Sequence, residues 1–198
     1  MSRPSTQEID RLASVAYWIS EMLDEHGYLV GEATSLHKSF TSTRRPSSSL
    51  ARELVLSGAR KGASISGLYP EDEAGGLDLI SIDDNTRRKY RIKRAVKTAD
   101  DKYELICGPG STLLHHEPDS LLIEERWVLG YVMNEEYVVE DLFAAQIVGA
   151  WGTGPVHLIL SDPIPLLVGT PPSGFASSVD DDLPGFEDDE NAIDGTTD

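Results

Sequence analysis

The sequence predicts an α+β fold, in which N-terminal helices precede a mostly antiparallel sheet with one packed helix and a disordered acidic C-terminal tail. Three observations support this prediction. The first 62 residues carry apolar residues at helical spacing together with helix-capping signals. From residue 63 onward, short runs with a period of two alternate with polar turns. The last 28 residues are acidic and contain few large apolar side chains.

Residues 5–62 form the predicted helical segment, and residues 1–4 before it are expected to be frayed. Ser5-Thr6-Gln7-Glu8 has the form of a capping box, in which the serine accepts from the third amide and the glutamate reaches back. The helix that it opens has an apolar stripe and is predicted to end at Gly27.

The stretch after the first helix is harder to assign. Residues 28–40 fit either a short strand and turn or a second short helix. Residues 41–49 are rich in serine and are predicted to form an exposed loop. A helix is then expected over residues 50–57, followed by a turn at residues 60–62.

Residues 63–170 are predicted to form an antiparallel β-rich domain that makes one fold with the helical segment. Strands are expected at residues 63–69, 77–82, 89–97 and 103–107, and polar turns join the last three into a meander. A final strand is expected at residues 156–160.

The longest apolar-rich stretch, residues 121–150, is predicted to be the organising element. Its first half has a period of two with both faces partly apolar, which predicts a strand covered on both sides. Its second half, residues 138–149, has apolar residues at helical spacing behind two acids, which predicts a helix. We expect one buried cluster with the stripe of the first helix, containing Trp127, Leu129, Phe143 and Ile147.

Residues 171–198 contain nine acidic residues, no basic residue and few large apolar ones. Such a segment cannot bury enough surface to offset its ordering entropy, so we predict a disordered tail. Removing its nine charges from the formal net charge of −17 leaves about −8 for residues 1–170. That charge argues against indiscriminate nucleic-acid binding but permits a local basic patch.

The compartment is predicted from what the sequence lacks. One cysteine, Cys107, allows no intramolecular disulfide and suits a reducing cytosol. The N-terminus has no signal-peptide core, and the chain has no apolar run of about 18 residues. We therefore expect a cytoplasmic protein that does not enter a membrane.

The basic stretch at residues 87–97 is the sharpest charge feature. Treated as a strand, it places a row of cations on one face: Lys89, Arg91, Lys93 and Lys97. Their spacing of about 6–7 Å is close to that of phosphates along a nucleic-acid strand. The row therefore predicts phosphate or nucleic-acid binding. Alternatively, these cations face solvent, pair with nearby carboxylates such as Asp78 and Asp101, or pair with the acidic tail.

The acidic tail is punctuated by apolar residues, with Leu183 and Phe186 near its centre. Apolar residues among acids in a disordered segment are a common form for short partner-binding motifs. We predict that Leu183 and Phe186 contact a protein partner, and the alternative is a solubilising tail without a partner.

Enzymatic chemistry finds little support. Cys107, His115 and His116 match no zinc-ligand spacing. A restriction-type nuclease would need Asp78 followed by an acid-x-Lys on the next strand, but Arg91 stands where that carboxylate is required. Glu104 would then have to replace it. We expect no catalytic residue, no cofactor and no metal.

Together these features favour a non-enzymatic cytoplasmic interaction protein, an adaptor or regulator whose flexible acidic tail touches a protein partner. The alternative is a nucleic-acid-associated or nucleic-acid-processing protein that uses the basic strand at residues 87–97. An open row of the four cations would favour that alternative.

Overall fold

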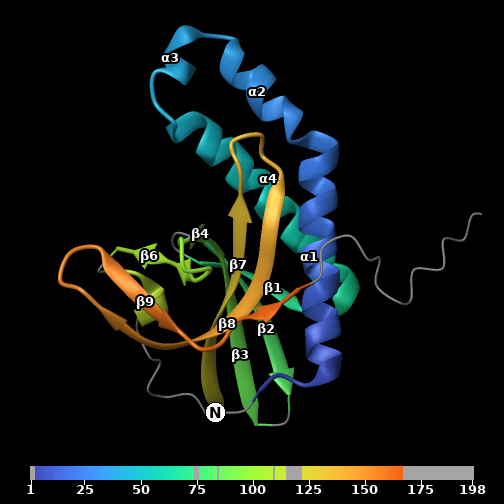
Figure 1. Ribbon diagram of the computed structural model, residues 1–198. Helices are drawn as coiled ribbons and strands as arrows, with labels where there is room; N and C mark the ends of the chain where they lie inside the picture. The colour runs from blue at the N-terminus through green and yellow to red at the C-terminus, as the bar shows by residue number, and fades with distance from the viewer. Residues whose placement is uncertain (1–2, 74–75, 84, 109, 115–121, 167–198) are drawn as a thin grey trace, which may run out of the picture.

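The computed structural model describes residues 3–73, 76–83, 85–108, 110–114 and 122–166, and it confirms the predicted α+β class (Figure 1). The helices are α1 (Thr6–His26), α2 (Tyr28–Ser35), α3 (Lys38–Thr41) and α4 (Arg45–Ser66), and Thr112–Leu114 forms a 3₁₀ turn. The strands are β1 (Tyr69–Glu73), β2 (Gly76–Asp83), β3 (Thr86–Arg94), β4 (Val96–Lys97), β5 (Tyr103–Glu104), β6 (Ile106–Cys107), β7 (Ile123–Met133), β8 (Val139–Trp151), β9 (Val156–Leu160) and β10 (Ile164–Pro165).

The large sheet has eight strands in the order β1-β2-β3-β7-β8-β9-β6, with β10 beside β8. Among the strand pairs of the described sheet, β3 and β7 run parallel and all the other pairs are antiparallel. β4 and β5 form a separate two-stranded sheet within the long connection from β3 to β7. The sheet is therefore mostly antiparallel, as the sequence predicts. The predicted meander is wrong in its last step, because β3 pairs with β7, while β5 pairs with β4 and β6 pairs with β9.

The start of α1 confirms half of the predicted capping box. The amide of Glu8 donates to the Ser5 hydroxyl over 3.2 Å, and Gly27 closes the helix by donating to the carbonyl of Leu23. The carboxylate of Glu8 does not return to the cap, because it bonds to Arg88 of β3 instead. Pro4, which was expected in a frayed end, is buried.

α4 is much longer than predicted, and this corrects three expectations. It begins at Arg45 within the predicted serine-rich loop, where Pro46 is preorganised for a first helical turn. It runs through the predicted turn at residues 60–62 and the start of the predicted strand at residues 63–69. Gly58 and Gly62 do not stop this helix, because they face α1. A Cβ at either position would lie 2.6 Å from the backbone of Trp18 or Val15.

The predicted helix at residues 138–149 is wrong, because this segment is the strand β8. Residues 142–145 are all buried, with alternate side chains entering the cores on the two faces of the sheet. A run of consecutive buried apolar residues has no helical or strand period of its own, so its spacing fits both structures. The helices that cover the sheet are α1 and α4.

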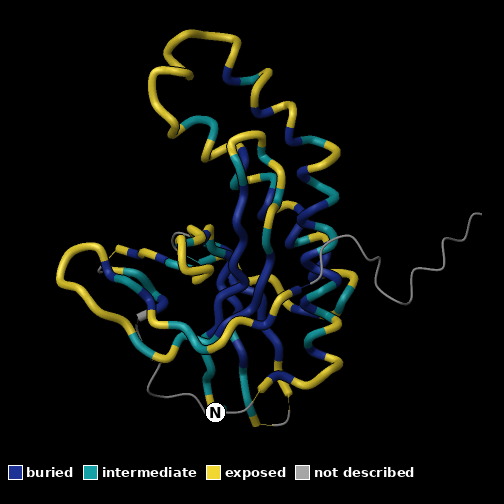
Figure 2. The backbone as a smooth tube through the Cα atoms, in the orientation of Figure 1, coloured by how far each residue is buried: buried dark blue, intermediate teal, exposed yellow. Residues whose placement is uncertain are grey.

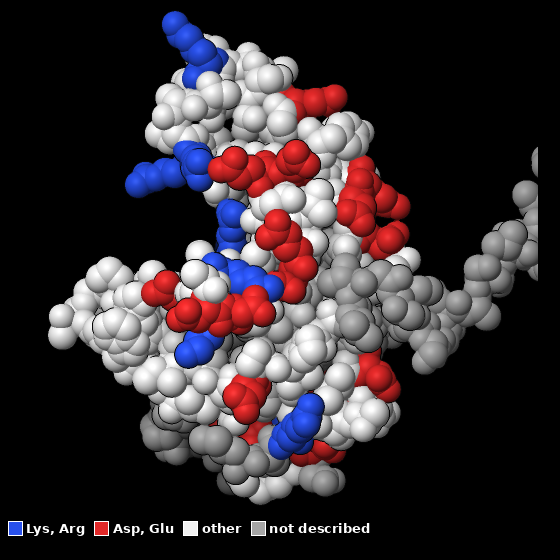
Figure 3. Space-filling view, viewed as in Figure 1, with Lys and Arg blue, Asp and Glu red and all other residues white. Residues whose placement is uncertain are grey.

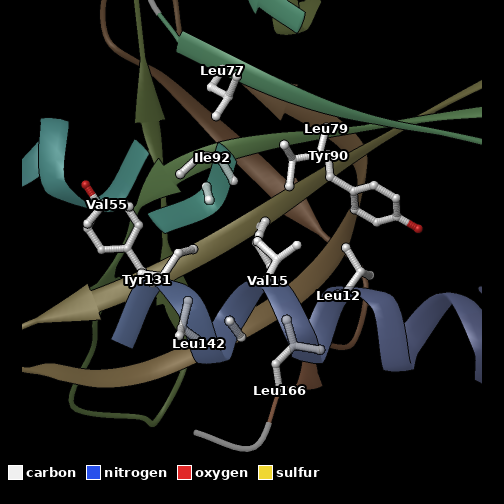
Figure 4. Packing of buried hydrophobic residues seen from close by; sticks show 14 of the residues in the cluster. Leu12, Val15, Val55, Leu77, Leu79, Tyr90, Ile92, Tyr131, Leu142 and Leu166 are labelled. Atoms are coloured by element: carbon white, nitrogen blue, oxygen red, sulfur yellow. The ribbon is translucent and has the colours of Figure 1, made fainter. Parts of the chain in front are cut away.

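Two hydrophobic cores lie on opposite faces of the sheet, and most of the buried residues in Figure 2 belong to them. The first joins α1 and α4 to the sheet, with Leu12 and Val15 directed toward Leu79 and Tyr90 (Figure 4). The second lies on the other face. The expected single buried cluster is therefore wrong in part. Trp127 and Leu129 belong to the first core, whereas Phe143 belongs to the second and Ile147, only partly buried, packs against it.

Residues 28–52 form what we call the helical arm, comprising α2, α3 and the first two turns of α4. The arm projects beyond the end of the sheet, and most of it is exposed (Figures 1 and 2). This settles the ambiguous stretch at residues 28–40 as helical. None of the described helices is long and apolar enough to cross a bilayer. The predicted tail at residues 171–198, with Leu183 and Phe186, lies outside the described residues.

Candidate functional site

The strand β3 alternates as predicted. Lys89, Arg91 and Lys93 share the face turned away from the helices, whereas Tyr90 and Ile92 enter the core beneath α1 and α4. The fourth predicted cation breaks this row, because the ladder ends at Arg94 and Lys97 belongs to β4 of the second sheet.

Arg91 is held by Asp78 on the neighbouring strand β2. Both side chains are buried, and the guanidinium donates to both carboxylate oxygens, with 2.9 Å between Nη2 and Oδ2. Nη2 also donates to the Thr112 hydroxyl over 3.0 Å. Burial alone would lower the pKa of Arg91, but the hydrogen bonds and charge of Asp78 outweigh it and the pKa is raised. Arg91 is therefore engaged within the fold.

Lys89 belongs to the same network through Glu124 of β7. Its Nζ lies 3.6 Å from Glu124 Oε2, while Arg126 Nε donates to Glu124 Oε1 over 3.1 Å. These groups surround a cavity of about 130 Å³, lined by Glu73, Asp78, Lys89, Arg91, Thr112, Leu113, Glu124 and Arg126. The three acids and three bases of this lining balance in formal charge, so the cavity is polar without a net excess of cations.

The remaining two cations differ from each other. Lys97 Nζ lies 2.9 Å from Asp141 and 3.1 Å from Asp101, and these hydrogen bonds raise its pKa. Lys93 makes no hydrogen bond or ion pair with any described residue, and its pKa is lowered mainly by burial, with further contributions from Arg91 and Arg52. The four cations do not form one open row, and their binding of phosphate stays a prediction.

A second charged cluster on β3 was not predicted. Arg88 points toward the helices, where its Nη1 lies 2.6 Å from Glu8 of α1 and its Nε lies 2.7 Å from Glu125 of β7. The side chains of Arg88 and Glu8 are 6% and 3% exposed, so they are desolvated almost completely. Burial raises the pKa of Tyr90, and the negative charge of Glu8 adds to that rise. This cluster joins the first helix to two strands.

Cys107, His115 and His116 were the residues considered for a metal site, and His157 on β9 is a further histidine of the described chain. Cys107 is buried on β6, and His157 stacks on Trp151 with 4.3 Å between ring centroids. Glu104, the substitute carboxylate of the nuclease hypothesis, lies 2.8 Å from His157. His115 and His116 lie outside the described residues. Within the described chain, no group of three or more His, Cys, Asp or Glu could hold a metal ion.

The helical arm has the surface that sequence reasoning missed. Large apolar side chains are exposed along it: Tyr28, Leu29, Leu36, Phe40 and Leu50. Leu36 is 80% exposed and Tyr28 is 62% exposed, far more than a residue used for packing. The sequence alone left residues 28–40 ambiguous between strand and helix and gave no sign of this exposure.

The arm also has a net charge opposite in sign to that of the molecule as a whole. Residues 28–52 contain four basic residues and one acid, whereas residues 1–170 together carry about −8. Lys38, Arg44 and Arg45 are exposed on the arm, and Figure 3 shows basic side chains on it and in the hollow beneath it. Arg52, at its base, is near enough for its charge to lower the pKa of Lys93.

No family model, curated protein or solved structure matches this chain.

Proposed function

We propose that this protein is a non-enzymatic cytoplasmic adaptor or regulator whose helical arm binds an acidic, apolar-punctuated segment of a protein partner. The observation that carries the proposal is the exposure of five large apolar side chains on a locally basic surface of an otherwise acidic protein.

The apolar side chains supply the affinity in this proposal. Burial of apolar surface contributes about 25 cal/mol per Å², and full burial of a Leu or Phe side chain about 1.5–3 kcal/mol. Exposed apolar groups that gather on one projecting element are typical of interaction surfaces. Leu36 is the C-cap residue of α2 and Phe40 lies in α3, four residues later, and both side chains are exposed to a partner.

The charges select the kind of partner. Lys38 and Arg45 make no ion pair with a described residue, and Arg44 has only an exposed pair with Glu135. Exposed pairs of this kind contribute little to stability, so a carboxylate from a partner can replace Glu135 at small cost. Complementary charge also raises the rate of association and disfavours basic partners.

Nucleic-acid binding through β3 is the weaker candidate. It needs Lys89, Arg91, Lys93 and Lys97 to be available together, yet Arg91 and Lys97 are hydrogen-bonded to carboxylates and Lys89 is close to one. Freeing Arg91 for a phosphate would leave Asp78 buried and unpaired, which is costly.

The test measures how tightly the full-length protein binds a designed acidic peptide. The peptide has Leu and Phe at helical spacing and carries a fluorophore. We expect an apparent Kd of about 10–1000 µM, because one short apolar segment releases only part of its burial energy after the cost of ordering. Amide chemical-shift changes should fall on residues 28–52. A basic peptide of the same apolar pattern should bind more weakly.

The decisive variant is Leu36→Ser/Phe40→Ser, which should weaken binding at least tenfold. Val148→Ser/Ile159→Ser is the control, because these residues are also large, apolar and exposed, at 41% and 46%, but lie on the sheet. Equal loss in both variants, or shifts confined to the sheet, would contradict the proposal.

A further inference from the structure

We propose that residues 179–193 of the chain's own acidic tail occupy the helical arm in cis and compete with the partner for it. This inference rests on the proposed function, since it assigns an occupant to the same surface.

The tail has the chemistry that the arm selects. It contains nine carboxylates and no basic residue, and its apolar residues Val179, Leu183, Phe186 and Ile193 alternate with those acids. The arm offers the complement, because it carries both exposed apolar side chains and the exposed cations Lys38, Arg44 and Arg45. One chain therefore contains both an acidic, apolar-punctuated segment and a basic, apolar surface complementary to it.

The tether is long enough. Leu166 is fixed in the first core, where its amide donates to the carbonyl of Leu142 over 2.9 Å. Val179 lies thirteen positions after Leu166, and a chain of that length can span about 43 Å when extended. The arm begins where α1 ends, and the whole of α1 is only about 31 Å long. The tail can therefore reach the arm along α1 without unfolding any described element.

The expected strength follows from effective concentration. A short flexible tether presents its segment at a concentration of the order of 1 mM. If the free tail segment binds the arm with a Kd of about 100 µM, the tethered tail occupies the arm about 90% of the time. A partner then binds about tenfold more weakly than it would to an unoccupied arm. Only an acidic partner that binds the arm more tightly than the tail does would then displace the tail.

The first experiment places a nitroxide label at Ser178→Cys in the otherwise full-length chain. Cys107 is buried and free, so it should resist labelling, and the wild-type chain treated in the same way checks this. We expect paramagnetic broadening of amides in residues 28–52, which is lost on adding Leu183→Ser/Phe186→Ser. Broadening elsewhere, or broadening that persists in this variant, would overturn the inference.

A mixed sample separates cis from trans docking. In this sample, the chain that carries the nitroxide contains no ¹⁵N, and the ¹⁵N chain whose amides are observed carries no nitroxide. We expect no arm broadening in this sample at 50 µM. Broadening there would mean that the tail binds a second copy, which would overturn the cis arrangement.

The second experiment measures the designed acidic peptide against full-length wild type and full-length Leu183→Ser/Phe186→Ser. We expect the variant to bind about tenfold more tightly, because its arm is unoccupied. Equal affinity for the two proteins would overturn the inference and leave the proposed function intact. Absence of binding to the variant, whose arm is open, would instead overturn the proposed function.

Discussion

Arg88 lies on the helix-facing side of β3, between residues that form the first core. A buried guanidinium is costly unless carboxylates and hydrogen bonds replace its water, and Glu8 and Glu125 do so here. Glu8 comes from the first turn of α1, 80 residues earlier in the sequence. The cluster therefore fixes how the first helix sits on the sheet.

Arg88→Met should destabilise the fold by about 3–5 kcal/mol, because it leaves the buried Glu8 and the partly buried Glu125 without their shared cation. The midpoint of urea unfolding measures this change. Arg87→Met is the control, since Arg87 pairs with Glu71 at the surface and its loss should cost about 1 kcal/mol or less. A similar loss in the two variants would contradict the argument from burial.

Lys93 and Lys97 should respond to substitution in opposite directions. Burial lowers the pKa of Lys93, so the unfolded chain binds this proton more tightly and the charge destabilises the fold at neutral pH. Lys93→Met should therefore raise the urea midpoint at pH 7. Lys97→Met should lower it, because hydrogen bonds to Asp141 and Asp101 raise the pKa of Lys97.

The pH dependence provides the check on these two lysines. The penalty from Lys93 is present at neutral pH and fades as the pH rises through the normal lysine range near 10.5, so the advantage of Lys93→Met should shrink there. The contribution of Lys97 is fully present below pH 10.5 and is lost as the pH rises from there through its higher folded pKa. A constant advantage of Lys93→Met up to pH 11 would refute this account.

At the scale of elements, β8 shows why a correct fold class can accompany a wrong element. Leu142, Phe143 and Ala144 are adjacent in sequence and all buried, so no alternation marks them as a strand. Only the neighbouring strands decide the matter, since β7 and β10 pair with this segment. Short strands bounded by polar turns, such as β2 and β9, were predictable because turn and period agree within one segment.

Phe143 is the residue on which the second core depends at this strand. It stacks on Tyr103 with 3.8 Å between ring centroids, and its ring covers Gly130 of β7, where a Cβ would overlap it. Phe143→Ala should cost about 3–5 kcal/mol in the free energy of unfolding, measured by urea denaturation. Ile147→Ala, at a partly buried position, should cost less. Near-wild-type stability of the Phe143 variant would contradict this packing.

The candidate sites show the same division between local and distant information. The shared face of Lys89, Arg91 and Lys93 was predictable from alternation alone. Their pairing was only partly so: Asp78 lies 13 residues away and was anticipated, but Glu124 arrives through the parallel pairing of β3 with β7. The arm was missed because its exposure depends on how far α2 and α3 project from the sheet, which no local pattern encodes.

For the whole molecule, truncation after Gly169 should leave the thermal midpoint within about 5 °C of the full-length value. Docking of the tail at the strength proposed above stabilises the fold by about 1.4 kcal/mol, since RT ln(1 + [L]/Kd) applies with a ratio near ten. That energy corresponds to a few degrees for a domain of this size. A larger drop, measured by calorimetry, would mean that residues after Gly169 contribute to the core.

Nucleic-acid binding tests the charge distribution of the whole molecule. We expect no affinity tighter than about 10 µM for a generic duplex or single strand at physiological salt, the weak end of non-specific binding. The reason is that residues 1–170 carry about −8 and two of the four cations on β3 and β4 are hydrogen-bonded to carboxylates. Deleting the nine-carboxylate tail removes a tethered competitor for the cations, so the truncated protein gives the most demanding test of this expectation. A salt titration of this truncated protein measures how many phosphates it contacts. Sub-micromolar binding, with the salt slope falling by about one for each charge reversed among Lys89, Arg91, Lys93 and Lys97, would replace the interaction-protein proposal with nucleic-acid binding.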